Sequence, residues 1–299
     1  MSSVISIVGH TALDYLFDVE GVAGPHESYP IVDYEVHFGG GAANIAVAIA
    51  VLGGDAQLIS AVGDDISTSG YEDHLLSMGV DLSLLYRLEG EKSTKAFVYT
   101  DGQHNQATYF YWGSSAHLPE LEPPKVDFVH LATSESSFNA RIAKKAGFVS
   151  FDPGQDLVTY PREDIETILD HTDILFTNRH EIERVCEMTD RSFSDLKDDI
   201  DVVVVTYDAE GSRIHTDDNE YFIPAIVVDA LDPTGAGDAY RAGFLLAYTR
   251  GYPLDVCGKI GSTVASFAVE TIGCQTDLPT WDKMGSRFEE NFGKLQILE

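Results

Sequence analysis

The chain carries Asp-Pro-Thr-Gly-Ala-Gly-Asp at positions 232–238, directly before a run of small and apolar residues, 239–249, that is typical of a helix. A glycine-rich turn that opens a helix leaves backbone N–H groups free at the positive end of the helix dipole. Such a turn binds phosphate, and Asp238 would lie in the first helical turn beside it. We therefore predict that 235–237 form an anion hole. Asp238 would accept the proton of a hydroxyl that attacks a phosphoryl group.

The same seven residues would also form an ordinary helix cap, with Asp238 facing the helix dipole. The two aspartates, the proline and threonine between them, and the long helix that follows favour the phosphate-binding interpretation. The loop differs from a Walker A motif, because no Gly-Lys-Ser/Thr follows the glycines.

Strand-like and helix-like segments alternate along most of the chain. Short runs rich in β-branched and aromatic residues predict buried parallel strands at 4–8, 57–62, 126–131, 148–151, 174–177 and 202–206. Helices are expected between them at 42–52, 69–78, 162–170 and 179–188. Because this alternation is typical of βαβ units, we predict one α/β domain over 1–299, with helices on both faces of the sheet.

Two segments, about 12–38 and 87–112, interrupt the alternation. In the second, β-type alternation continues on both sides of a turn at Asp101-Gly102, which predicts a β-hairpin. We interpret both segments as strands of a small sheet beside the main body. A small sheet next to an active site can act as a lid.

Two further motifs open predicted helices. Positions 39–44 are Gly-Gly-Gly-Ala-Ala-Asn, where the glycines would let a ligand approach the backbone and Asn44 would bind hydroxyls. A loose turn before a packed helix is the alternative. Asn178 and Glu181 share one helix face, where a carboxylate could organise hydrated Mg²⁺ beside phosphates. Their spacing by itself favours an N-capped surface helix, with Asn178 as the cap.

Three more segments follow predicted strands. Asp14, just after the first strand, could hold two vicinal hydroxyls of a ribose, and a solvent-facing aspartate is an equal alternative. Asp152 lies in 151–155, at the carboxyl end of a strand, where open α/β sheets bind ligands. That segment could equally be a plain β-turn. Positions 206–212 could line a nucleotide and also predict a hairpin.

The charge balance excludes several kinds of partner. The chain has 49 acidic and 19 basic residues, for a net charge of -30, so we expect neither nucleic acid nor an anionic membrane surface to bind it. Three widely spaced cysteines and the lack of a long apolar run indicate a cytoplasmic protein with reduced thiols. Because the acids are scattered through the chain, we hypothesise adaptation to high intracellular salt, which screens self-repulsion.

Taken together, the motifs resemble those of the ribokinase (PfkB) family of sugar and nucleoside kinases over nearly the whole chain. Positions 39–44 look like the family's N-terminal signature, and 232–238 match its C-terminal signature, Asp-x-x-Gly-Ala-Gly-Asp. Asn178 and Glu181 match its Asn-x-x-Glu magnesium motif. The resemblance implies a ribokinase-like three-layer α/β/α sandwich with a small β-sheet lid, which in this family often pairs with a second lid into a homodimer.

Within the family the chain is most similar to archaeal nucleoside kinases, in segments 9–15, 151–156, 240–244, 273–276 and 278–283. This similarity implies ATP- and Mg²⁺-dependent phosphorylation of a nucleoside at its ribose 5′-hydroxyl. The alternative is a sugar kinase of the same fold: a ribokinase, fructokinase, phosphofructokinase or 2-keto-3-deoxygluconate kinase. Few Arg and Lys in the N-terminal half favour a neutral acceptor. A second alternative, a non-catalytic nucleotide-binding regulatory protein, fits poorly with the presence of both Asp238 and Glu181.

The resemblance also implies a role for each site residue. Asp238 would be the base, and the anion hole would consist of Gly235, Ala236 and Gly237. The acceptor would be held by Asp14, Gly40, Gly41, Asn44 and Asp152 together with Asp238. ATP would lie along Asn178, Thr206, Asp208, Gly211, Gly235 and Gly237, and Glu181 would organise Mg²⁺ through water. One stretch departs from the family, since Tyr207, Asp208 and Glu210 stand where Lys or Gly is common.

Overall fold

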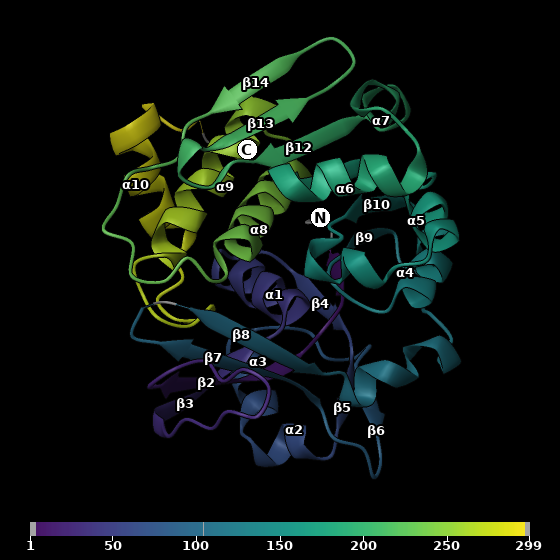
Figure 1. Cartoon of the computed structure of the whole chain (residues 1–299). Coiled ribbons are helices and arrows are strands. Elements are labelled where there is room, and N and C mark those ends of the chain that lie inside the picture. The colour runs from purple at the N-terminus through teal and green to yellow at the C-terminus, as the bar shows by residue number, and fades with distance from the viewer. Residues whose placement is uncertain (1–3, 104, 297–299) are drawn as a thin grey trace.

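The structure is a computed structural model that describes residues 4–103 and 105–296. Its main sheet has eight strands in the order β14-β13-β12-β11-β10-β9-β1-β4 (Figure 1). The strands are β1 (Ile5–Val8), β4 (Ala56–Ile59), β9 (Phe128–Leu131), β10 (Phe148–Phe151), β11 (Ile174–Asn178), β12 (Val202–Thr206), β13 (Ser212–His215) and β14 (Glu220–Ile223). Neighbours from β4 to β12 are parallel, whereas the pairs β12–β13 and β13–β14 are antiparallel. The predicted α/β architecture is confirmed.

Helices cover both faces of this sheet. One face carries α1 (Gly41–Val51), α8 (Ala236–Thr249) and α9 (Leu254–Ala268), with α10 (Trp281–Phe292) packed on α9. The other face carries α4 (Ser136–Ala143), α5 (Arg162–Leu169), α6 (Arg179–Thr189) and α7 (Phe193–Asp199). Three 3₁₀ helices, η1 (Gly113–Glu120), η2 (Gly154–Thr159) and η3 (Asp208–Glu210), connect the strands and helices.

Side chains of the central strands alternate between two hydrophobic cores. Ile174 and Phe176 of β11 belong to the core under α8 and α9, whereas Leu175 belongs to the core under α4 to α6. Val202 and Val203 of β12 divide in the same way. Since both faces of these strands are buried, the sequence shows continuous apolar runs there instead of a period of two.

A small sheet stands beside the main body, next to α1 (Figure 1). Its strands are β3 (Ile31–Gly39), β2 (Ala12–Val19), β7 (Thr94–Asp101) and β8 (Gln106–Tyr111), in that spatial order. The central pair β2–β7 is parallel and the outer pairs are antiparallel. Stacked rings join the strands, with Phe17 4.8 Å from Tyr99 and Tyr15 5.2 Å from Phe97 between ring centroids. Such aromatic pairs stabilise adjacent strands beyond their buried area.

One predicted strand was wrong in detail. The strand expected over 57–62 is divided at Ser60, where β4 ends in the main sheet and β5 (Ala61–Gly63) pairs with β6 (Tyr86–Leu88). Both pieces are buried, so hydrophobicity could not reveal the change of sheet. The helix expected over 69–78 is α3 (Tyr71–Ser77), which begins after Gly70, whose φ of +79° separates it from the short, unpredicted α2 (Asp65–Thr68). No helix within 4–103 and 105–296 is long and apolar enough to cross a membrane.

Candidate active site

The glycine-rich loop 232–238 folds into a turn that opens α8. Thr234 N–H donates to Asp232 Oδ1 at 2.9 Å, and Gly235 is the N-cap of α8 with φ of +80°. The helix begins at Ala236, three residues earlier than the sequence pattern predicts. A Cβ on Gly235 would lie 2.8 Å from both Cβ and Sγ of Cys274. Only glycine therefore fits here in backbone conformation and in space, and the N–H groups of the turn stay at the positive end of the helix.

Asp238 lies in the first turn of α8 and meets α1 from the N-terminal half. Its Oδ2 accepts a hydrogen bond from Asn44 Nδ2 at 2.9 Å, across 194 positions of sequence. Burial raises the pKa of Asp238 to about 6, while Arg241 and the Asn44 hydrogen bond lower it and Asp152 raises it further. A carboxylate with a pKa close to neutral is suited to accept a proton near pH 7.

Asp14, on β2, is the second acid beside the glycine run 39–41, and Asp238 is the first. Its Oδ2 lies where a Cβ on Gly39 would be, 1.9 Å from that position, so the absence of a side chain at Gly39 makes room for the carboxylate. Burial raises the pKa of Asp14 from its ordinary value to about 7, Asp238 raises it further, and His37 opposes the change. Gly40 has φ of +92°, and a Cβ there would lie 2.4 Å from the His10 carbonyl oxygen.

We expect the Asp14→Asn variant to be more stable than the wild type at pH 8. The folded-state pKa of Asp14 is above the unfolded value, so the folded protein binds more protons between about pH 4 and pH 7 and loses stability as the pH rises through that range. Asp14 remains partly exposed, so we expect a gain of about 2–4 kcal/mol in the free energy of unfolding at pH 8 and little at pH 4.

Urea unfolding at several pH values measures this gain. Asp18→Asn, on the same strand but exposed to solvent, is the matched control and should leave the pH dependence unchanged. Parallel stability curves for Asp14→Asn and the wild type would contradict the expectation.

A buried arginine on α8 stands between three carboxylates. Arg241 Nε lies 2.7 Å from Asp152 Oδ2, as an ion pair without good hydrogen-bond direction. Asp238 and Glu181 also act on Arg241 electrostatically. Burial raises the pKa of Asp152, and Arg241 opposes that rise. The guanidinium folds back on the turn 235–237, since a Cβ on Gly237 would lie 2.4 Å from Arg241 Nη1.

Arg241 is not among the functional residues predicted from the sequence. Its spacing was a signal, because a residue three positions after Asp238 shares that residue's face of the helix. It is also the only cation between Ala236 and Thr249.

Asn178 and Glu181 form a capping box at the start of α6. Asn178 Oδ1 accepts from the backbone N–H groups of His180 and Glu181, and Glu181 Oε2 accepts from Asn178 N–H at 2.8 Å. This is the capped helix that the spacing favours. Burial and the neighbouring Asp152 raise the pKa of Glu181 to about 7, with Arg241 opposing. No cluster of three or more His, Cys, Asp or Glu that could hold a metal ion by itself occurs among the described residues.

The segment 206–212 is less closely tied to these groups. Thr206 ends β12, and its hydroxyl donates to the Thr177 carbonyl at 3.3 Å. The Asp208 side chain is 76% exposed and pairs with Arg179 at the surface. At Gly211 a Cβ would lie 2.1 Å from the Ile223 carbonyl oxygen, so this glycine lets β13 and β14 approach.

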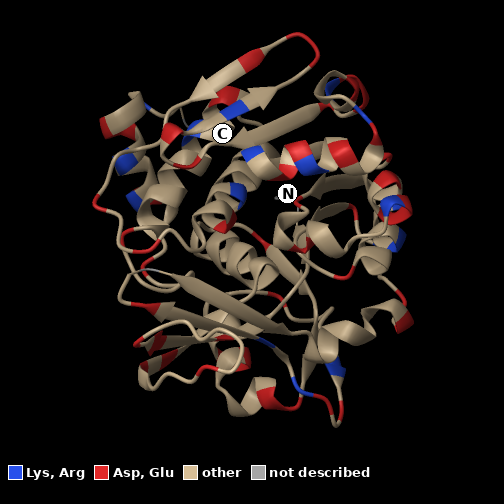
Figure 2. Ribbon diagram, in the orientation of Figure 1, with Lys and Arg blue, Asp and Glu red and all other residues tan. Residues whose placement is uncertain are grey.

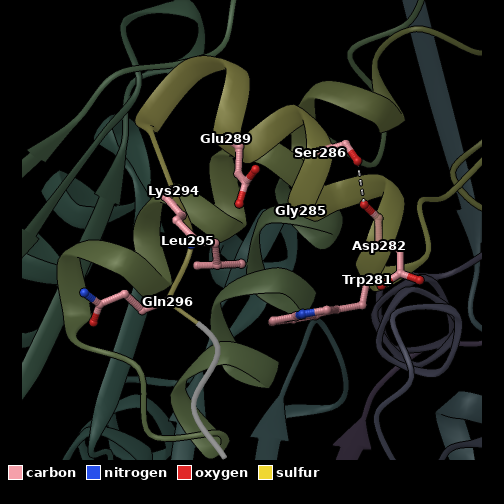
Figure 3. Close-up of a pocket in the computed structure, with 8 residues that line it drawn as sticks. All are labelled: Trp281, Asp282, Gly285, Ser286, Glu289, Lys294, Leu295 and Gln296. Atoms are coloured by element: carbon pink, nitrogen blue, oxygen red, sulfur yellow. Dashed lines mark hydrogen bonds between the residues drawn. The ribbon is translucent and has the colours of Figure 1, made fainter.

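One groove of the described structure lies away from these residues. It has a volume of about 740 Å³ and follows α10 and the segment after it (Figure 3). Its lining consists of Trp281, Asp282, Gly285, Ser286, Glu289, Lys294, Leu295 and Gln296. None of the predicted site residues lines this groove.

Comparison with known proteins gives a consistent result. The model of the pfkB family of carbohydrate kinases matches residues 3–281. A nucleoside kinase of Methanocaldococcus jannaschii is 47% identical over 293 residues, covering 96% of this chain and 97% of that protein. A nucleoside kinase of Methanothermobacter thermautotrophicus is 43% identical over 296 residues, covering 96% of each.

Solved structures agree with these sequence matches. The crystal structure of the M. jannaschii nucleoside kinase superposes with a TM-score of 0.92 at 46% identity, covering 97% of this chain and 99% of that one. A Burkholderia thailandensis nucleoside kinase in complex with inosine superposes with a TM-score of 0.87 at 27% identity, covering 97% of each chain.

Proposed function

Since this chain belongs to the pfkB family of carbohydrate kinases, and is therefore a phosphotransferase with an alcohol group as acceptor, we propose that it phosphorylates a nucleoside at the ribose 5′-hydroxyl, with ATP as donor and Mg²⁺ as cofactor. The observation that carries the proposal is the meeting of Asp238, Asn44 and Asp14 at the glycine-lined end of α8. Nearly full-length identity of 47% and 43% to two nucleoside kinases supports the nucleoside as acceptor.

The chain's own residues would perform the transfer as follows. Asp14 and Asn44, with Gly40, Gly41 and Asp152 around them, would hold the ribose so that its 5′-hydroxyl faces Asp238. As the hydroxyl oxygen bonds to the γ-phosphorus and the bond to the ADP oxygen breaks, the hydroxyl proton passes to Asp238. The N–H groups of 235–237 would stabilise the charge on the phosphoryl oxygens.

The donor nucleotide would lie on the other side of the loop, along Asn178, Thr206, Asp208 and Gly211. Glu181 is the residue best placed to organise Mg²⁺ through water. Burial and the negative charge of Asp152 raise the pKa of its carboxyl group to about 7. A divalent cation nearby would offset the repulsion between these two carboxylates. When bound, Mg²⁺ would neutralise charge on the phosphate oxygens.

We expect Glu181→Gln to raise the Mg²⁺ concentration needed for half-maximal rate about tenfold or more, without lowering the melting temperature. Glutamine can still accept from Asn178 N–H, so the capping box remains, and the substitution removes a carboxylate whose pKa is raised to about 7 by burial. Mg²⁺ titrations of the rate, together with thermal melts, test this. Glu183→Gln, on an exposed position of the same helix, is the control. A clear loss of stability with an unchanged Mg²⁺ requirement would show that Glu181 only caps the helix and does not organise Mg²⁺.

We also propose that the small sheet acts as a lid over the acceptor and pairs with the lid of a second copy. Exposed apolar side chains on its edge strands support the pairing, among them Ile31, Val32 and Tyr34 on β3 and Tyr109 on β8. Isolated exposed apolar residues are normal, but a group of them on one sheet is typical of an interaction site.

A cytoplasm of high salt fits the charge of the chain. Acidic residues are spread over the main body and the small sheet, with far fewer Lys and Arg among them (Figure 2). We expect the melting temperature to rise steadily from about 0.1 M to about 3 M KCl, because screening removes the mutual repulsion of a net charge of -30. Thermal melts monitored by circular dichroism check this. A flat or falling dependence would rule out salt adaptation.

A substrate screen tests the proposed activity. Purified protein is given Mg-ATP at high KCl with nucleosides, ribose, fructose, fructose 6-phosphate and 2-keto-3-deoxygluconate side by side. We expect the highest kcat/KM with a nucleoside. A sugar that exceeds all nucleosides would favour the sugar kinase alternative, and nucleoside binding without turnover would favour a regulatory protein.

A further inference from the structure

A directed chain of hydrogen bonds leads from the end of β3 to Asp238. Tyr71 OH donates to the Gly39 carbonyl at 2.7 Å, and Gln275 Nε2 donates to Tyr71 OH at 2.7 Å. The same Nε2 donates to Asn44 Oδ1 at 2.9 Å, and Asn44 Nδ2 donates to Asp238 Oδ2 at 2.9 Å. These hydrogen bonds thereby join β3, α3, α1 and α8 through the turn that contains Gln275.

The direction of every hydrogen bond in this series follows from the first one, which Tyr71 OH donates to the Gly39 carbonyl. A backbone carbonyl can only accept, so the single hydroxyl hydrogen of Tyr71 is committed to Gly39. The Tyr71 oxygen can then only accept, which requires Gln275 to present its NH₂ group. The second hydrogen of that NH₂ group requires Asn44 to present Oδ1, and Asn44 Nδ2 must therefore face Asp238.

The opposite end of the Gln275 amide is held as well. Gln275 Oε1 lies 3.0 Å from His74 Nε2, and because Oε1 cannot donate, His74 must carry its proton on Nε2. Tyr71 is fully buried and stacks on Phe38, with 4.4 Å between ring centroids. Rotation of the Gln275 amide by 180° would break its bonds to His74, Tyr71 and Asn44 at once.

We propose that Gln275 is a positioning residue for the reaction, which fixes the orientation of the Asn44 amide so that a donor is always presented to Oδ2 of Asp238. With Oδ2 occupied, Oδ1, which faces Gly41, is the oxygen left to accept the hydroxyl proton. Were Asn44 turned over, its carbonyl oxygen would face the carboxylate, and Asp238 would hold a proton instead of accepting one. This inference rests on the proposed role of Asp238 as the base.

Other groups also act on the Asp238 carboxyl. Arg241 lies on its own helix, while Asp14, Asp152 and Cys274 approach from other elements. None of these belongs to the hydrogen-bond chain, so variants of Gln275 and Tyr71 change the orientation of Asn44 without changing any charge near Asp238.

The test uses two uncharged variants of the full chain, Gln275→Met and Tyr71→Phe. Both keep side-chain volume, and phenylalanine keeps the stack on Phe38. The carboxyl carbon of Asp238 is titrated by ¹³C NMR, with its signal identified by its absence in Asp238→Asn. We expect the pKa of Asp238 to rise by about one unit in both variants. The acid limb of kcat with Mg-ATP and inosine should move by the same amount, which is about a tenfold loss at pH 5 and little change at pH 9.

The controls separate positioning from packing. Gln103→Met, in an exposed turn, should leave both titrations unchanged, and KM for Mg-ATP should stay the same in every variant. An unchanged Asp238 pKa in Gln275→Met would overturn the inference, whatever the acceptor is. A wild type that phosphorylates no nucleoside would instead overturn the proposed function, and the NMR titration would still decide the role of Gln275.

Discussion

Asp238→Asn is expected to lower kcat by a factor of about 10²–10⁴ while the protein keeps its fold. Asparagine can still accept from Asn44 Nδ2 through its side-chain oxygen, so the contact between α1 and α8 is preserved. The variant loses only the group that takes the hydroxyl proton. In the wild type, kcat should rise with pH through about 6, because burial raises the pKa of Asp238 to about that value and only the ionised form is a base.

Steady-state kinetics between pH 5 and pH 9, together with thermal melts, measure both effects. Asp282→Asn is the matched control, since Asp282 also lies in the first turn of a helix, α10, but is exposed and lines a groove to which the loop 232–238 does not contribute. Its rate should equal that of the wild type. A near-normal rate for Asp238→Asn would remove Asp238 from the mechanism.

Arg241→Met is expected to destabilise the protein by about 3–5 kcal/mol at pH 8. Arg241 is the buried partner of Asp152 and lies close to Asp238 and Glu181, so its removal leaves buried negative charges without a cation. Their folded-state pKa values should rise further above the unfolded values. The folded variant then binds more protons than the unfolded chain, and its stability falls more steeply than that of the wild type as the pH rises from about 4. At pH 5 the loss should be clearly smaller.

Urea unfolding at pH 5 and pH 8 gives the two free energies. The double variant Asp152→Asn/Arg241→Met should regain much of the stability, because the uncompensated charge is then removed. Arg162→Met is the matched surface control. Arg162 pairs with Glu166 and Asp190 in solvent, so its loss should cost no more than about 1 kcal/mol. An Arg241→Met penalty as small as that of Arg162→Met would show that the buried pair contributes little.

Much of the fold could be predicted because its strongest signals are local. The buried strands β9 to β12 are short apolar runs, and α8 and α1 follow glycine-rich turns, so each is visible in a window of about ten residues. The division at Ser60 was invisible for the same reason, since β4 and β5 are equally apolar although they enter different sheets.

The candidate site was predictable only in parts. The loop 232–238, Asn44 and Asp14 stand out as motifs, but no local pattern places Asn44 against Asp238 across 194 positions of sequence. Arg241 and Gln275 lie in segments that resemble archaeal nucleoside kinases, but neither was given a role, because each is a single polar residue outside the recognised motifs. Their importance comes from what tertiary structure places beside them, namely Asp152 for Arg241 and Asn44 for Gln275.

The glycines of the two motifs have a consequence for how this sequence can diverge. The space that a side chain would need is filled by an oxygen of Asp14 at Gly39, by Cys274 at Gly235 and by Arg241 at Gly237. Each glycine is thus one half of a pair whose other half lies elsewhere in the chain. Because Gly235 also has φ of +80°, a smaller residue at 274 would not by itself permit a side chain at 235, and we expect that position to stay glycine. A descendant that gains a methyl group at 237 would require Arg241 to move or to change, so we expect 237 and 241 to evolve as a pair.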